Sequence, residues 1–159
     1  MSFDVGDKVV YPHHGAAIIE RRETKEAFGT EREYLVLRLS FGDLVLMVPV
    51  DGTDEVGLRD VIGDDEVEDV FEVLRKKEAR VPTNWSRRFK NHEEKLKSGD
   101  VYQVAEVVRN LSQRGKEKGL SAGEKRMFAK ARQILVSELI FAIDTSPQEA
   151  EARLDEVLT

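Results

Sequence analysis

Short runs of β-forming side chains, separated by turn residues, occupy the first fifty residues. In one run Leu35, Leu37 and Leu39 share one face of the predicted strand, and Tyr34, Val36 and Arg38 share the other. Pro12 predicts a turn after the first run, and Gly29 predicts a hairpin between the second and the third. The predicted strands are residues 7–11, 16–21, 33–39 and 44–50. Short strands with tight turns are typical of a small barrel or a curled sheet, which we expect here.

From residue 64 onward the apolar side chains recur every three to four residues, the period of an amphipathic helix. Ser121 followed by Glu124 fits a capping box, and Ser146 precedes Pro147 at a first helical position. Five helices are predicted, beginning near residues 64, 85, 101, 121 and 146. The sequence therefore predicts an α+β chain with a β domain over 1–52, a junction over 53–63 and a five-helix bundle over 64–159.

The predicted strand at 44–50 is apolar at successive positions, whereas a strand with one face in water alternates. An inner strand of a small barrel, covered on both sides, would fit this pattern. An apolar edge strand on which another protein docks would fit it too, and Pro49 suits an edge because proline donates no ladder hydrogen bond. The sequence leaves both interpretations open.

The charge of the chain is divided unevenly. The 159 residues carry a net charge of −6, but residues 81–135 contain 13 Lys and Arg against 6 Asp and Glu. Residues 1–80 contain 11 against 19. Since a phosphate responds to charge within a Debye length of about 8–10 Å, the basic segment predicts a polyanionic partner despite the acidic average.

Several kinds of chemistry find no support in the sequence. The chain has no cysteine, no glycine-rich phosphate loop and no apolar run near the roughly 18 residues of a membrane span. His13 and His14 are adjacent in one turn, but neighbouring side chains diverge and no third ligand accompanies them. A hydrolase using either histidine would need a pocket that joins it to a carboxylate. We expect a cytoplasmic protein without a signal peptide, not an enzyme, with no metal, cofactor, membrane or small-molecule substrate.

The single tryptophan begins the second predicted helix and is followed by Arg87, Arg88 and Lys90. Such cations contact phosphates without reading sequence, and a flat ring can wedge into a minor groove. Trp85 could equally pack on Phe89, one turn later, as a core residue with the cations in solvent. The segment is thus a candidate DNA-binding surface with a structural alternative.

A second basic run crosses the connection between the third and fourth predicted helices. Its members are Arg114, Lys116, Lys118, Lys125, Arg126, Lys130 and Arg132. Two basic segments on separate helices can converge in a compact bundle, although a charged run can also be a solvated helix face. From this run we add Arg114 to the candidate DNA-binding residues.

Three segments together resemble the CarD family of bacterial transcription regulators, its actinobacterial members above all. They are Val9-Val-Tyr-Pro-His-His-Gly-Ala16, Pro82-Thr-Asn-Trp-Ser-Arg-Arg88 and Gly119-Leu-Ser-Ala-Gly-Glu-Lys-Arg-Met127. The resemblance runs essentially from end to end. It implies a Tudor-like N-terminal module, shared with the transcription-repair coupling factor, that docks on the β subunit of RNA polymerase.

The resemblance also implies a role for the helices. The family's helical domain touches promoter DNA at the upstream edge of the melted bubble, in complexes with housekeeping-sigma holoenzyme, and reads promoter structure more than sequence. The tryptophan matching Trp85 wedges into the minor groove and hinders bubble collapse, and cations matching Arg87, Lys90 and Lys125 support the DNA backbone. We expect a monomer that stabilises the open promoter complex.

Two positions concern the polymerase. Where some relatives carry arginines, this chain has Lys25 and Met47. Lys25 keeps the charge, whereas Met47 forms no salt bridge, so docking is expected to rely more on apolar contact. The alternative function is a protein–protein adaptor whose helices bind another protein and not DNA; scattered cations and a buried indole would favour it.

Overall fold

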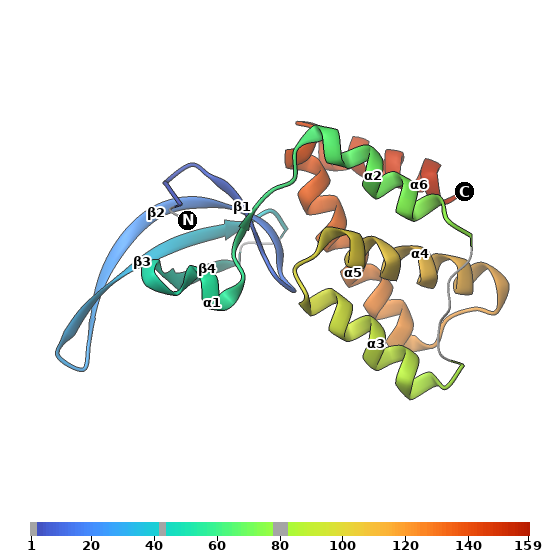
Figure 1. Ribbon diagram of the computed structural model, residues 1–159, viewed down its shortest axis with the longest axis horizontal. Helices are drawn as coiled ribbons and strands as arrows, with labels where there is room; N and C mark the ends of the chain where they lie inside the picture. The colour runs from blue at the N-terminus through green and yellow to red at the C-terminus, as the bar shows by residue number, and fades with distance from the viewer. Residues whose placement is uncertain (1–2, 42–43, 78–82) are drawn as a thin grey trace.

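The computed structural model describes residues 3–41, 44–77 and 83–159, which form an antiparallel sheet beside a helical bundle (Figure 1). The strands are β1 (Lys8–Tyr11), β2 (Gly15–Ala27), β3 (Thr30–Leu39), β4 (Val45–Pro49) and β5 (Arg59–Asp60). Their order in the sheet is β4-β3-β2-β1-β5, with antiparallel neighbours throughout. The sheet is open and curved, and its four predicted strands are confirmed.

Two features of the sheet differ from the sequence expectations. β4 is an edge strand, so the interpretation as an inner barrel strand is wrong and the predicted edge position is confirmed, while docking of another protein on this strand stays a prediction. The segment predicted as a junction contributes α1 (Thr53–Val56), after the 3₁₀ turn Val50–Gly52, and then β5, which pairs with β1. A two-residue strand has too few alternating positions to be detected by periodicity.

One face of the sheet carries its core. The buried side chains on that face are Phe3, Val9, Ala17, Ile19, Leu35, Leu37, Leu39, Val48 and Leu58. The leucines of β3 are at most 6% exposed, as their alternation predicted. β2 and β3 continue beyond this core as a long hairpin arm, with Phe28 (φ 53°) and Gly29 (φ 77°) at its tip.

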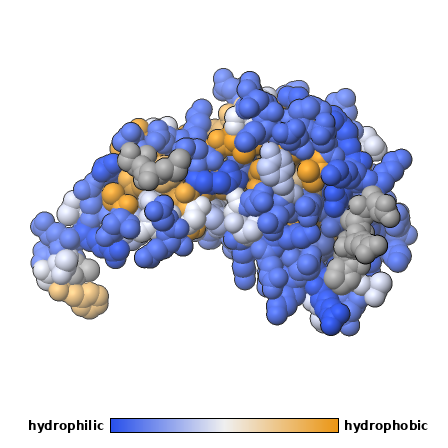
Figure 2. All heavy atoms as spheres, in the orientation of Figure 1, coloured by the Kyte–Doolittle hydropathy of each residue, from blue (hydrophilic) through white to orange (hydrophobic). Residues whose placement is uncertain are grey.

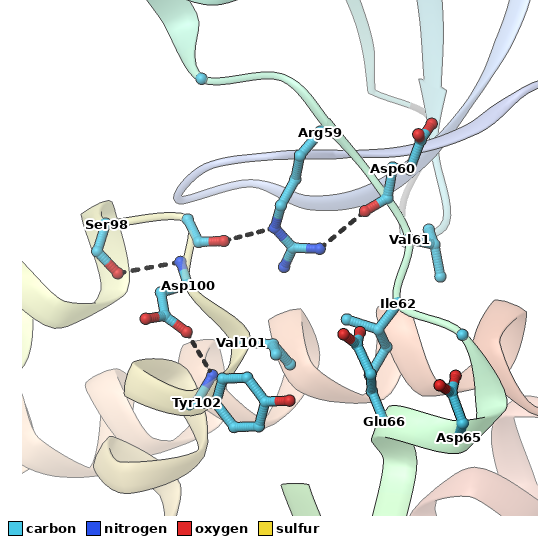
Figure 3. Close-up of a pocket in the computed structure, with 13 residues that line it drawn as sticks. Arg59, Asp60, Val61, Ile62, Asp65, Glu66, Ser98, Asp100, Val101 and Tyr102 are labelled. Atoms are coloured by element: carbon cyan, nitrogen blue, oxygen red, sulfur yellow. Dashed lines mark hydrogen bonds between the residues drawn. The ribbon is translucent and has the colours of Figure 1, made fainter. Parts of the chain in front are cut away.

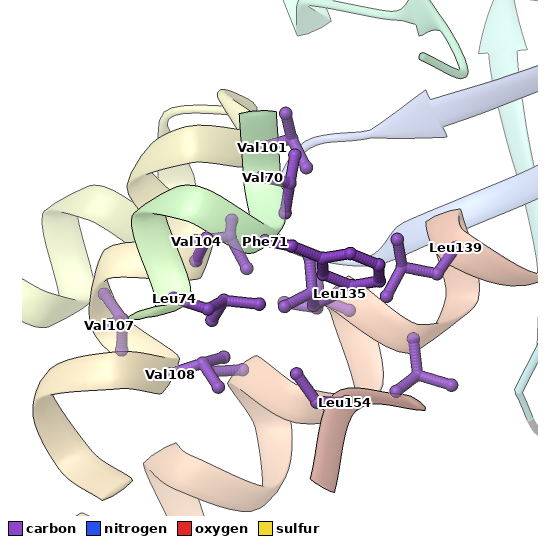
Figure 4. Packing of buried hydrophobic residues seen from close by; sticks show 14 of the residues in the cluster. Val70, Phe71, Leu74, Val101, Val104, Val107, Val108, Leu135, Leu139 and Leu154 are labelled. Atoms are coloured by element: carbon purple, nitrogen blue, oxygen red, sulfur yellow. The ribbon is translucent and has the colours of Figure 1, made fainter. Parts of the chain in front are cut away.

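The predicted bundle of five helices is confirmed. The helices are α2 (Asp64–Arg75), α3 (Trp85–Lys97), α4 (Val101–Glu117), α5 (Ala122–Ala142) and α6 (Pro147–Leu158). Phe71 of α2 packs among Leu135 and Leu139 of α5 and Leu154 of α6, in a core that α4 completes with its valines (Figure 4). The capping box at Ser121 and the proline start of α6 are also present.

The sheet is held against the bundle by a partly buried ion pair. The Arg59 guanidinium of β5 donates two hydrogen bonds of 2.7 Å to the Glu138 carboxylate of α5, which is 4% exposed. Its Nε donates to the Gly99 carbonyl in the α3–α4 turn at 2.6 Å, a contact visible in Figure 3. Since one arginine joins three elements, the orientation of sheet and bundle is fixed by specific polar contacts.

The β1–β2 turn provides the second attachment. The Ala16 amide donates to Ser137 Oγ of α5 at 2.9 Å. Gly15 lies so close to α5 that a Cβ added there would stand 2.7 Å from Ser137 Oγ, and its φ of 102° also requires glycine. This turn is the segment that contains His13 and His14, so its sequence is explained in part by helix contact.

Candidate nucleic-acid interface

Trp85 occupies the first position of α3 and leans on the start of α5. Asn84 caps α3 by accepting from the Arg87 amide at 3.1 Å. The indole stacks on Phe89, with ring centroids 4.9 Å apart and planes 18° from parallel. Its Nε1 donates to Ser121 Oγ at 3.3 Å, and the side chain remains 45% exposed. Both sequence interpretations therefore apply in part, because the ring is packed on one side and open on the other.

Ser121 connects this indole to the fold. Its hydroxyl caps α5 by accepting from the Glu124 amide at 3.2 Å, and it donates to Glu124 Oε1 at 3.2 Å. A serine hydroxyl offers one donor and two acceptor sites, so the bond from Trp85 completes its capacity. The capping box was readable from the sequence, but its contact with a side chain 36 residues earlier was not.

Gly123 leaves room for the two aromatic rings on α5. A Cβ built on Gly123 would lie 3.5 Å from Phe89 Cε1 and 3.7 Å from Trp85 Cζ2. Any branched or long side chain at this position would displace the rings. The indole orientation is thus set by Phe89, Ser121 and Gly123 together, which preorganises it before any ligand arrives.

Arg88 does not lie on the surface where the sequence placed it. Its side chain is buried, with Nε 3.1 Å from Glu124 Oε2 and Nη1 donating to the Thr83 carbonyl at 3.2 Å. Burial opposes ionisation of Glu124, but hydrogen bonds from Arg88 and Ser121 outweigh it and hold the pKa of the Glu124 carboxyl below its usual value. This arginine joins α3 to α5 and is buried, so the exposed position that the sequence predicted for it is wrong.

Arg114 is placed similarly. Its Nε lies 3.4 Å from the same oxygen of Glu124, and its side chain is 30% exposed. Helical spacing alone could not reveal that a buried carboxylate on α5 would attract both arginines. Arg114 therefore borders the predicted surface without offering it an unpaired charge.

Three predicted cations do project into solvent without a partner. In the described part of the chain, no carboxylate, hydrogen-bond acceptor or ring engages the side chains of Arg87, Lys90 or Lys125, which are all exposed. Arg87 and Lys90 share one side of α3, and Lys125 stands in the first turn of α5, two residues after Gly123. These cations occupy the two helices that Trp85 joins.

The two residues predicted to meet polymerase share the outer face of the sheet. Lys25 of β2 lies opposite Arg32 of β3, and Met47 of β4 lies opposite Val36 of β3, which also faces Arg21 of β2. Arg32 and Val36 alternate with the core-facing leucines of β3. Lys25 and Met47 therefore both lie on the side of the sheet opposite the core. Lys25 is exposed and Met47 is half-buried. Figure 2 shows apolar atoms reaching the surface of the sheet, whereas the visible face of the bundle is mostly hydrophilic.

Phe28 is an exposed group on the sheet domain that sequence reasoning missed. It is fully solvent-exposed at the tip of the β2–β3 arm, three residues from Lys25. The signal was an aromatic residue directly before Gly29 in a predicted hairpin turn, where no core is within reach. On this face, Ile18 and Val45 are also 38% and 40% exposed.

His92 makes the bundle sensitive to acid. It is 1% exposed on α3, and burial, reinforced by the positive charge of Lys95, lowers its pKa to about 4. An unfolded chain binds this proton near pH 6.5, so stability is full above that pH and falls as the pH drops toward 4. We predict a loss of roughly 2 kcal/mol between pH 7 and pH 5 from this residue alone.

Urea unfolding of the wild type and of His92→Gln at both pH values measures that contribution. The glutamine variant should lose less stability on acidification, because it has no side chain that titrates in this range. Equal losses in the two proteins would show that His92 is not responsible.

The described residues contain neither a metal-binding cluster nor a membrane-spanning helix. No group of three or more His, Asp or Glu side chains within residues 3–41, 44–77 and 83–159 is arranged to hold a metal ion. Within these same ranges, no helix combines the length and hydropathy needed to cross a membrane.

Comparison with known proteins identifies the family. Residues 3–62 match the CarD-like/TRCF RID domain, and residues 69–155 match the CarD C-terminal domain. The chain belongs to the CarD family. It is 36% identical over 137 residues to "Putative transcription factor YdeB" of Bacillus subtilis (strain 168), covering 86% of this chain and 90% of that protein.

A solved structure of a family member is also similar in sequence. It is the solution NMR structure of the 72-residue N-terminal domain of Myxococcus xanthus CarD, 30% identical, with 37% of this chain and 79% of that chain covered at a TM-score of 0.33. The CarD-family protein described here is thus a transcription regulator with an RNA polymerase-interacting N-terminal domain and a helical C-terminal domain, in a family that is not enzymatic.

Proposed function

We propose that this CarD-family protein docks on the β subunit of RNA polymerase and stabilises the open promoter complex by placing Trp85 in the minor groove at the upstream edge of the bubble. One observation carries the proposal: a half-exposed, preorganised indole lies where two helices present cations that have no partner among the described residues. The adaptor alternative called for a buried indole and scattered cations, and neither describes this surface.

The energetics of such a contact favour a tethered protein. Arg87, Lys90 and Lys125 offer only a few phosphate contacts, so binding to DNA alone should be weak and strongly dependent on salt. Docking on polymerase raises the effective concentration of the bundle at the promoter. A ring that binds melted DNA better than closed duplex shifts the opening equilibrium by that difference, and about 1.4 kcal/mol gives a factor of ten.

The outer face of the sheet is suited to the docking step. Met47 and Val45 of the edge strand β4 and Ile18 of β2 provide apolar area on this face, and Phe28 and the charged Lys25 lie further along the hairpin arm. An exposed edge strand with apolar neighbours can pair with a strand of another protein. We propose that this face meets polymerase assembled with the housekeeping sigma factor, in the cytoplasm, and that the protein acts as a monomer.

A footprint of the polymerase–promoter complex, with and without this protein, tests the proposal. We expect added protection at the upstream edge of the bubble and longer-lived reactivity of the unpaired bases inside it. The same promoter without polymerase should show no footprint at equal protein concentration. Binding to polymerase with an unchanged footprint would contradict DNA contact and favour the adaptor.

A further inference from the structure

Two arginines differ from the other described arginines because their side chains have no partner within the described ranges. Every other described arginine has a hydrogen bond, an ion pair or a ring contact, whereas the side chains of Arg87 and Arg126 have none. Arg87 follows Trp85 by two residues on α3, and Arg126 lies on α5. Arg126 Nη2 lies 3.9 Å from a Cβ built on Gly123, the same point that is 3.7 Å from Trp85 Cζ2. The guanidinium and the indole thus border one spot on α5.

The surface of α5 beyond this spot is basic and hollowed. A hollow of about 630 Å³ lies along the helix. Its lining residues include Lys125, Arg126, Lys130 and Arg132, with Glu151 as the one acidic member. Arg132 pairs with Asp155 of α6, which leaves the other three cations unpaired among the described residues. A concave surface with this charge fits a polyanionic strand.

Lys130 extends the surface to the sheet. It follows Arg126 by one helical turn, so the two share a side of α5. Burial and then the charge of Lys130 lower the pKa of both His13 and His14, which places the lysine beside the β1–β2 turn. The unpaired cations therefore run from the indole toward the junction of the two domains.

We propose that α5 supplies a second DNA contact, in which Arg126 enters the minor groove beside Trp85 and Lys130 binds the adjoining phosphate backbone. Arginine is favoured in a narrow minor groove because its flat, weakly hydrated guanidinium fits the negative potential there. A groove opened by the indole has room for the neighbouring side chain. This inference rests on the proposed insertion of Trp85 and adds Arg126 and Lys130 of α5 to the proposed DNA contacts.

The lifetime of the open complex under competitor DNA, measured across a series of salt concentrations, tests this assignment. Arg126→Ala should shorten the lifetime about fivefold and reduce the salt slope by about one. Arg126→Lys should keep the slope yet recover only part of the lifetime, since lysine keeps the charge without the planar fork. Lys130→Ala should reduce the slope as well, and Lys130→Arg should restore it.

Arg153→Ala is the matched control, because it removes an arginine from α6, where Arg153 lies over the Phe71 ring and outside the hollow. It should leave lifetime and slope unchanged.

An unchanged lifetime in Arg126→Ala, alongside a shortened one in Trp85→Ala, would overturn this inference and leave the proposed function standing. A shorter lifetime in Arg126→Ala with an unaltered salt slope would also overturn the proposed groove contact. So would a lifetime in Arg126→Lys equal to that of the wild type. No effect in Trp85→Ala would count against the proposed function itself.

Discussion

Replacing Trp85 with alanine is expected to shorten the lifetime of the open promoter complex about tenfold while leaving polymerase binding intact. Trp85 is the one large apolar side chain exposed on the described part of the bundle. Removing it takes away the group that prefers unstacked DNA and keeps the cations, which attract closed and melted promoters alike. Decay of preformed complexes after addition of competitor DNA measures the effect.

Trp85→Phe provides a graded control. A phenylalanine can still stack on Phe89 but has no N–H for Ser121, so an intermediate lifetime is expected. Both variants should unfold close to the wild type, since nearly half of the indole surface is already in water. Equal lifetimes for wild type and Trp85→Ala would rule out the wedge, provided that both proteins bind polymerase.

Replacing Glu124 with alanine is expected to cost about 3–5 kcal/mol of folding stability. The carboxylate is 2% exposed, and its loss would remove the buried negative charge that lies 3.1 Å from Arg88 Nε. It would also remove one half of the capping box that starts α5. Urea unfolding at pH 7 measures the loss, which is large beside the stability of a typical domain.

The double variant Arg88→Met, Glu124→Leu distinguishes the role of Arg88 in the ion pair with Glu124 from a role in DNA contact. Replacing both charges with apolar side chains should recover part of the lost stability, because the buried Arg88 charge is removed together with its partner. The rest is not recovered, since Arg114 still loses its ion pair and α5 still loses the Glu124 half of its capping box. If Arg88 only joins the helices, this variant should also keep a near-normal open-complex lifetime. A stable double variant with a collapsed lifetime would restore Arg88 as a DNA-binding residue, and a Glu124→Ala loss below 1 kcal/mol would contradict the structural role.

The fold was largely predictable because its signals are local. Alternation fixed the inward face of β3, and capping residues fixed the starts of α5 and α6. β5 was missed because two residues carry no period, and the position of β4 at the edge depends on pairing that its own residues do not encode. The local pattern of residues identifies a strand, whereas the strands that lie next to it in the sheet depend on the sequences of all the strands.

The candidate interface was predictable only in part. The sequence singled out Trp85 and the cations around it, since residue type and spacing suffice to suggest a ring flanked by charge. It could not separate Arg87 from Arg88, which are adjacent cations of the same type. The distinction arises because Glu124, 36 residues further along, is buried opposite one of them.

By itself, the sequence determined the order along the chain of the first four strands and the five bundle helices, the basic character of residues 81–135 and the family to which the chain belongs. Only the tertiary structure decided which cations are neutralised inside and which remain available, how the indole rests on α5, and how Arg59 and Glu138 set the sheet against the bundle. The physical reason is that charge and exposure depend on partners brought together by folding. Periodicity and capping depend only on neighbours along the chain.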